Sequence, residues 1–119
     1  GREVRMLVPT NDHDGTLAWF QAVFAWPVLR DWPGGSLLTI DGDTRLEILS
    51  GNDDFPPVES LAGTTLVIET DDVAAVHSRA LAAGAEVKQP PQLKPWGHVN
   101  MILQDPNGLR VAVFEVPRG

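Results

Sequence analysis

The same order of predicted elements occurs twice along this chain of 119 residues. In each half a short strand leads into a helix, and three further strands follow. The stretch 42–49 also aligns with 107–114 in its apolar pattern, which places Arg45 over Arg110. We therefore predict an α+β fold, a single domain over 1–119. The domain has two βαβββ modules, at about 1–52 and 64–119, joined by a linker at about 53–63. The two modules are expected to form a curved, cleft-bearing mixed sheet with the helices on its outer face.

Periodicity and turn residues give the bounds of these elements. A polar loop at 11–15 offers Asp12 or Asp14 as a helix N-cap, and Gly84 is a typical residue to end the second helix. The break at Gln89-Pro90-Pro91 limits the strand before it. The predicted strands are 4–8, 28–32, 36–40, 45–49, 64–70, 85–88, 99–103 and 109–114, and the predicted helices are 16–25 and 73–83.

The last two strands read as a β-hairpin. They flank Asp105-Pro106-Asn107-Gly108, in which proline presets φ and Asn-Gly tolerates the positive φ of a tight reversal.

Composition limits the class of protein. The hydrophobic fraction of 43% is ordinary for a soluble protein, and no apolar run approaches the roughly 20 residues of a membrane span. The first residues, Gly1-Arg2-Glu3-Val4, lack the apolar stretch of a signal peptide, and there is no cysteine. We expect a cytoplasmic protein that neither binds a membrane nor contains a disulfide or a thiolate metal site.

Sixteen acidic and nine basic residues give a net charge of −7. This charge argues against a nucleic-acid partner, which requires a basic surface. It is compatible with a cationic small ligand, whose encounter rate long-range attraction would raise. The alternative is that the acidic surface serves only solubility.

Histidines give no clear catalytic pattern. His13, His77 and His98 are not paired with other ligand types at metal-binding spacing, and no Ser/His/Asp signature or phosphate loop occurs. His98 is the most notable, because it lies beside Trp96 near the expected mouth of the cleft.

Aromatic residues point to ligand binding. Trp19 and Trp26 flank the first helix and are expected to pack in the core. Trp32 and Trp96, with Phe55 and Phe114, could line a cleft and stack on a planar ligand. The alternative is that these rings cover a dimer interface.

The chain resembles a known superfamily. The paired βαβββ modules, the segment Asp72-Val73…Arg79…Ala83-Gly84-Ala85-Glu86-Val87 and the segment Pro95-Trp96-Gly97…Asp105-Pro106-Asn107-Gly108 are similar to those of the vicinal oxygen chelate superfamily, which includes glyoxalases, bleomycin-resistance proteins and extradiol dioxygenases. The resemblance implies a cleft on the open sheet faces and a homodimer. Pro9 is a candidate hinge for domain swapping between subunits.

The enzymes of this superfamily hold a divalent metal on the first and last strands of the modules. The resemblance places those positions at about Arg5 and Thr65 on the first strands, and at Glu47 and Ala112 on the last. Only Glu47 could bind a metal, because arginine is a permanent cation and alanine has no ligand atom. Arg5 and Glu47 could instead pair with each other, or contact a ligand.

The resulting hypothesis is a non-catalytic binding protein without a metal or cofactor, similar to the bleomycin-resistance type. It would sequester a bulky, aromatic and cationic natural product, such as an antibiotic, in a cleft of a homodimer. Whether the chain is an enzyme stays open. The alternatives are a lyase, isomerase or dioxygenase, with His98 or Glu47 as the base if no metal takes part, and an accessory protein of a natural-product pathway. The predicted ligand-binding residues are Arg5, Trp32, Leu38, Glu47, Phe55, Trp96, His98, Asn100, Ile102 and Phe114.

Overall fold

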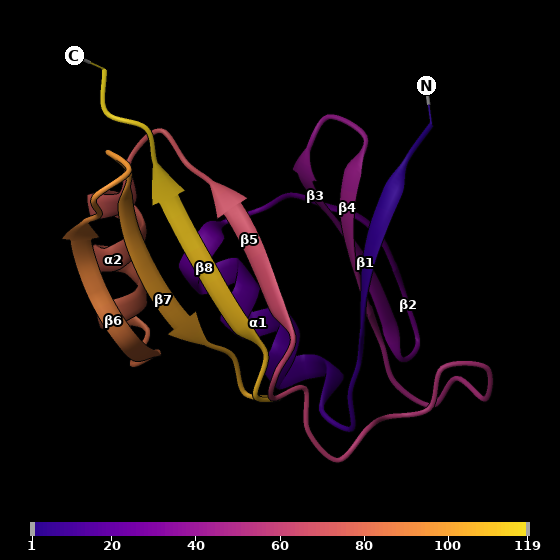
Figure 1. Ribbon diagram of the computed structural model, residues 1–119. Helices are drawn as coiled ribbons and strands as arrows, with labels where there is room; N and C mark the ends of the chain where they lie inside the picture. The colour runs from indigo at the N-terminus through magenta and orange to yellow at the C-terminus, as the bar shows by residue number, and fades with distance from the viewer. Residues whose placement is uncertain (1, 119) are drawn as a thin grey trace. The chain divides into compact units, whose positions relative to one another are not determined.

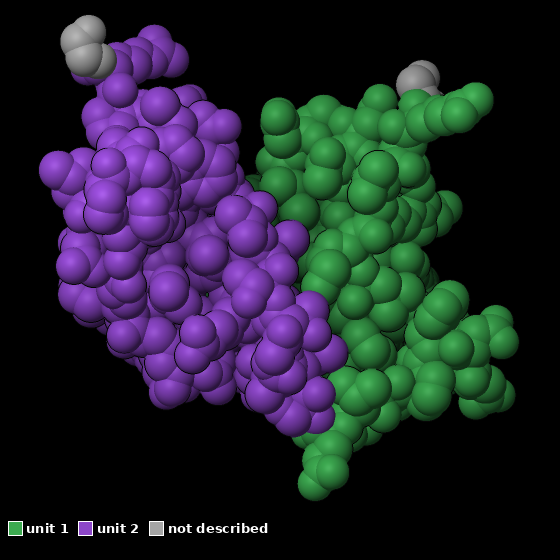
Figure 2. All heavy atoms as spheres, in the orientation of Figure 1, with its two compact units in different colours: residues 1–21, 25–59 green, residues 22–24, 60–119 purple. Residues whose placement is uncertain are grey.

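The computed structural model describes residues 2–118. The predicted N-terminal segment and the predicted domain bounds also include Gly1 and Gly119, which lie outside the described residues. The chain forms two compact units (Figure 2), one made of 1–21 and 25–59 and the other of 22–24 and 60–119. Neither helix in the described part is long and apolar enough to cross a membrane. Each unit contains one four-stranded mixed sheet (Figure 1), which confirms the α+β fold with two βαβββ modules.

In the first unit the strand order is β1-β4-β3-β2, and β1 runs parallel to β4. Its core contains Val8, Leu38, Leu46 and Ile48, none of which is exposed. The elements of this half are β1 (Val4–Pro9), α1 (His13–Phe24), β2 (Val28–Trp32), β3 (Gly35–Asp41) and β4 (Thr44–Leu49).

The second unit repeats this topology as β5-β8-β7-β6, with β5 parallel to β8. Helix α2 packs against β6, β7 and β8, and buries Val73, Val76 and Ala80. The elements are β5 (Thr65–Glu69), α2 (Val73–Ala82), β6 (Glu86–Leu93), β7 (Val99–Gln104) and β8 (Arg110–Glu115).

The strand register displays the internal repeat. Arg5 pairs with Arg45 in the first sheet, and Thr65 pairs with Arg110 in the second. Two residues further along, Glu47 and Ala112 occupy equivalent places on β4 and β8. The predicted correspondence of Arg45 and Arg110 is confirmed.

Helix caps follow the local sequence. Asp12 caps α1 by accepting a hydrogen bond from the Gly15 amide, so this helix begins at His13 and not at Thr16 as predicted. Asp72 caps α2 in the same way through the Ala75 amide. Gly84 follows α2 with φ of 69°, in the left-handed region that glycine tolerates best.

Two predictions about the second half are wrong. Strand β6 does not stop before Gln89 but continues to Leu93, because it is an edge strand in which the missing amides of Pro90 and Pro91 break few ladder bonds. Its pairing with β7 shifts register there. On α2, the helical spacing of Val73, Val76, Ala80 and Leu81 predicts one apolar face, yet Leu81 is 60% exposed.

Candidate functional site

Each sheet has one face on the core side and one opposite face. In the first unit the opposite face is called the Glu47 face, and pairing with Glu47 or its neighbours in register places these residues on it: Arg5, Leu7, Trp32, Leu37, Arg45 and Leu49. In the second unit it is called the Phe114 face, and it carries Val67, Glu69, Gln89, Gln92, Asn100, Ile102, Gln104 and Ala112. These faces hold most of the predicted ligand-binding residues.

On the Glu47 face, Arg5 and Glu47 form an ion pair. Arg5 Nη1 lies 3.4 Å from Glu47 Oε1, and Arg5 Nε donates to Glu3 Oε1 at 2.6 Å. The hydrogen bond to Glu3 raises the pKa of Arg5, and Glu47 adds to that effect. The guanidinium is therefore cationic, and it occupies one oxygen of the Glu47 carboxylate.

Arg45 lies beside this pair in register. Its side chain contacts Glu3 and Asp43 and donates to the Gly42 carbonyl, but its buried Nε has no hydrogen-bond partner among residues 2–118. This N–H is buried and lies 3.6 Å from Glu3 Oε2, within ion-pair distance but without a hydrogen bond.

Trp32 lies flat against the backbone of β3. A Cβ added at Gly35 would meet the Trp32 ring at 2.2 Å, so only glycine allows this approach. The guanidinium of Arg30 lies 5.7 Å from the ring centroid, at cation–π distance. Because Trp32 pairs with Gly35, the half-buried ring belongs to the Glu47 face.

Leu38 does not lie on this face. It pairs with Leu46 in the core and has no exposed surface, so it cannot contact a ligand on the Glu47 face. Its neighbour Leu37 pairs with Glu47 and takes that place. Both leucines are buried, so the hydrophobic pattern could not indicate which one points away from the core.

The Phe114 face brings together four of the predicted residues. Phe114 pairs with Asn100 across the strands, and Ile102 pairs with Ala112. The His98 ring stacks on Phe114, with centroids 4.9 Å apart and an interplanar angle of 13°. All four predicted side chains are half-buried.

Lys94 organises the polar part of this face. Its Nζ donates to Gln89 Oε1 and to Gln92 Oε1, both at 3.0 Å. Gln89 Nε2 in turn donates to the backbone carbonyl of Asn100 at 3.4 Å. Sequence reasoning missed these three residues, because the predicted strand ended before Gln89.

Trp96 and Phe55 are not among the residues of the Glu47 face or of the Phe114 face. Trp96 lies in the turn between β6 and β7 and is 62% exposed, and Phe55 lies in the segment between β4 and β5 and is 50% exposed. Neither ring contacts another aromatic ring within the described part of the chain.

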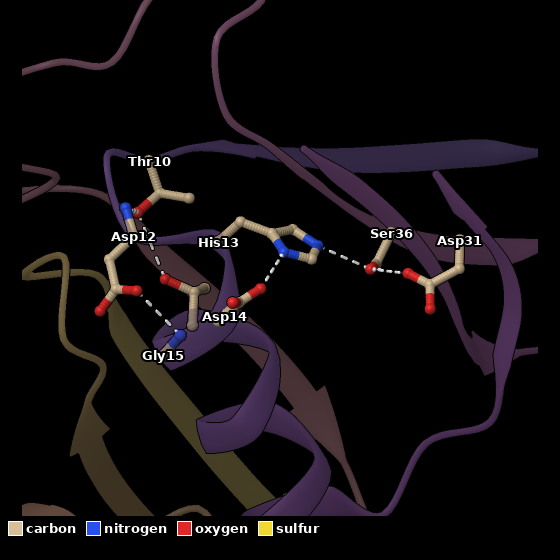
Figure 3. A network of polar contacts seen from close by, with 8 residues as sticks. Thr10, Asp12, His13, Asp14, Gly15, Asp31 and Ser36 are labelled. Carbon is tan, nitrogen blue, oxygen red and sulfur yellow. Dashed lines mark hydrogen bonds and ion pairs between the residues drawn. The ribbon is translucent and has the colours of Figure 1, made fainter. Parts of the chain in front are cut away.

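A further cluster, which the sequence did not indicate, joins α1 to β2 and β3 (Figure 3). His13 Nδ1 lies 2.9 Å from Asp14 Oδ1, and His13 Nε2 lies 2.7 Å from Ser36 Oγ. This order of groups is the one found in Asp-His-Ser catalytic triads.

The cluster lacks the chemistry of a triad. Ser36 Oγ donates its only proton to Asp31 Oδ1 at 2.6 Å, so His13 Nε2 must be the donor to Ser36 and cannot act as its base. Ser36 is also fully buried and out of reach of a substrate. The network therefore fastens the start of α1 to the sheet.

Two hollows lie away from the predicted residues. One, of about 610 Å³, lies at the ends of β5 and β8. It is lined by Glu69, Thr70, Asp71, Glu115 and the segment 116–118. The other, of about 330 Å³, lies at the start of α1 beside His13 and Gly34. Of the two opposite faces, only Glu69 contributes to either hollow.

Comparison with known proteins defines the class. Residues 4–113 match the Glyoxalase/Bleomycin resistance protein/Dioxygenase superfamily, and the chain belongs to this superfamily. No protein among the curated sequences matches the chain.

Solved structures show the same fold. TioX from Micromonospora sp. ML1 is 24% identical with a TM-score of 0.81, covering 98% of this chain and 100% of that chain. TnmS3, an antibiotic binding protein from Streptomyces sp. CB03234, is 23% identical with a TM-score of 0.77, covering 98% and 97%. A bleomycin resistance determinant encoded on the transposon Tn5 is 20% identical with a TM-score of 0.72, covering 99% and 100%.

In this chain, the residues at the metal-binding positions of the superfamily enzymes are not suited to hold a metal. In the first unit Glu47 is paired with the permanent cation Arg5, and in the second unit the equivalent of Glu47 is Ala112. Within residues 2–118 no group of three or more histidine, aspartate or glutamate side chains is arranged to hold an ion. The residues present do not supply the donor set of a metal centre.

Proposed function

We propose that this protein is a non-catalytic binding protein that sequesters a bulky, aromatic small molecule, such as an antibiotic, in a cleft of a homodimer. The observation that carries the proposal is the Arg5–Glu47 ion pair at 3.4 Å, because a cation occupies the place where an enzyme of the superfamily would hold its metal. Binding by shape and stacking needs no metal. Resistance would follow from mass action, since bound drug is withheld from its target.

Aromatic and polar groups on the two faces support this function. Each face carries a half-buried ring, Trp32 in the first unit and Phe114 in the second. The second face also carries a buried polar atom without a hydrogen-bond partner in the described chain, Asn100 Oδ1. Free hydrogen-bonding groups beside rings are typical of sites that recognise organic molecules.

The binding experiment uses chelator-treated protein and a panel of bleomycin-like, enediyne, mitomycin-like and polycyclic aromatic compounds. Four tryptophans and no tyrosine give a clean fluorescence signal. We expect saturable quenching, with the compound recovered unchanged. Phe114→Leu and Trp32→Leu should weaken binding, whereas the control Leu81→Ala, on the exposed surface of α2, should not.

Two results would overturn the proposal in favour of an enzyme. One is a compound that returns chemically altered. The other is a tightly bound divalent ion, about one per chain, that is lost in Glu47→Ala. Failure of every compound to bind would also contradict sequestration of this class of molecule.

We also propose that the protein acts in the cytoplasm as a homodimer, with Pro9, at the end of β1, as the hinge if strands exchange. Sedimentation equilibrium tests the assembly. A dimer gives twice the chain mass of 12.9 kDa, and a value of 12.9 kDa at all concentrations contradicts it.

A further inference from the structure

The amide of Asn100 contains an unusual acceptor. Its Oδ1 is buried, yet it accepts no hydrogen bond from any residue in 2–118. The nearby Gln89 side chain donates to the backbone carbonyl of Asn100 and not to this oxygen. The residue as a whole is half-buried, so a rotation of its amide brings this free acceptor to the surface of the Phe114 face.

Such a group lowers the stability of the folded protein. A buried carbonyl oxygen has lost its water and has gained no protein donor in return. An apolar side chain of similar shape would avoid this cost. The position of Asn100 on a face that carries an aromatic ring indicates that the missing donor comes from a ligand.

The neighbours of Asn100 define what kind of donor fits. In register, Phe114 lies between Asn100 and Glu69, so one ring is flanked by two oxygen acceptors. Glu69 forms no ion pair within the described residues. The ammonium of Lys94 is held by the side-chain carbonyl oxygens of Gln89 and Gln92.

We propose that Asn100 is the specificity-determining residue for planar aromatic ligands that carry N–H donors at the ring edge, in particular amino-substituted aromatic cations. The ligand's ring packs beside Phe114 and the His98 ring that stacks on it, one N–H donates to Asn100 Oδ1, and Glu69 attracts the positive charge. This inference rests on the proposed binding function and adds the ligand's chemical class to it.

Two dyes with the same cationic ring system test the inference. Proflavine carries free amino groups at both ends of the ring system, whereas in acridine orange those nitrogens are dimethylated and donate no hydrogen bond. Both cations keep the N–H of the ring nitrogen, so the dyes differ only in their exocyclic amino donors. Binding of each dye is measured by calorimetry to the wild type, to Asn100→Leu and to the control Gln21→Leu, which lies on the exposed surface of α1 and on neither face.

For proflavine, Asn100→Leu should weaken binding about tenfold, the loss of one charge-assisted hydrogen bond. Acridine orange should bind the wild type and Asn100→Leu with affinities within about twofold of each other, and Gln21→Leu should leave the binding of both dyes unaffected. Asn100→Asp keeps an acceptor oxygen and should retain proflavine binding.

Thermal unfolding of the ligand-free variants supplies an independent readout. Asn100→Leu should raise Tm, because it removes an unpaired buried acceptor, whereas Gln21→Leu should change Tm little. A lower Tm for Asn100→Leu would show that the amide has a structural partner and would overturn the inference.

The binding results separate the two proposals. If proflavine binds Asn100→Leu as tightly as the wild type, the inference fails while the proposed binding function stands. If neither dye binds the wild type, the inference and the binding of aromatic cations fail together.

Discussion

At the scale of single residues, the fold is stabilised by side chains that link segments distant in the chain. Ser36 accepts from His13 and donates to Asp31, so one hydroxyl connects α1, β3 and β2. His13 and Ser36 are 23 positions apart in the chain, so no local sequence motif indicated their contact.

Ser36→Ala should lower the free energy of unfolding by about 1–2 kcal/mol, because a buried donor and an acceptor both lose their partner. Urea unfolding followed by tryptophan fluorescence measures this. The matched control is Ser78→Ala on the exposed surface of α2, which should stay within about 0.5 kcal/mol of the wild type. A Ser36→Ala variant as stable as the wild type would show that the network contributes nothing to the fold.

At the scale of elements, the two helices end differently. Ala25, after α1, has φ of 57° and is the non-glycine residue with positive φ in the described chain, whereas Ala83, after α2, has φ of −82°. A left-handed conformation strains alanine because its Cβ approaches the following carbonyl.

Ala25→Gly should therefore raise the free energy of unfolding by about 0.5–1 kcal/mol, the relief of strain less the backbone entropy of glycine. The same substitution at Ala83 relieves no strain and should lower it or leave it unchanged. Chemical denaturation of both variants checks the pair, and stabilisation by Ala83→Gly alone would contradict the explanation.

The β7–β8 hairpin depends on Asp105, which is 3% exposed. Its Oδ1 accepts from the amides of Asn107 and Leu109, at 2.8 and 2.9 Å. Asp105→Ala should cost about 2–3 kcal/mol, because two backbone donors are left without an acceptor. Asp53→Ala, exposed and between the two modules, is the control and should have little effect in the same urea titration.

At the scale of the whole molecule, the net charge of −7 provides a test of ligand charge. If it serves binding, the affinity for proflavine should fall by about threefold between 20 and 300 mM NaCl, because salt screens long-range attraction. Fluorescence anisotropy of the dye measures this. An affinity independent of salt would assign the acidic surface to solubility alone.

The sequence by itself determined the architecture. Alternation with period two identified the strands, and it placed Asn100, Ile102 and Phe114 on one face because neighbouring strands in register keep that alternation. Asp and Gly residues marked the caps and the hairpin, since those signals act over a few residues. The resemblance to the superfamily placed the metal positions, and the sequence shows Arg5 and Ala112 at two of them.

Tertiary structure alone decided the details of the candidate site. Leu37 and Leu38 are both apolar and both buried, so only the register of β3 shows that Leu37 shares the Glu47 face. The prolines of β6 were tolerated because the strand lies at a sheet edge, which is a property of strand order. The unpaired oxygen of Asn100 and the Ser36 network depend on contacts between segments distant in the chain, and no local pattern encodes those contacts.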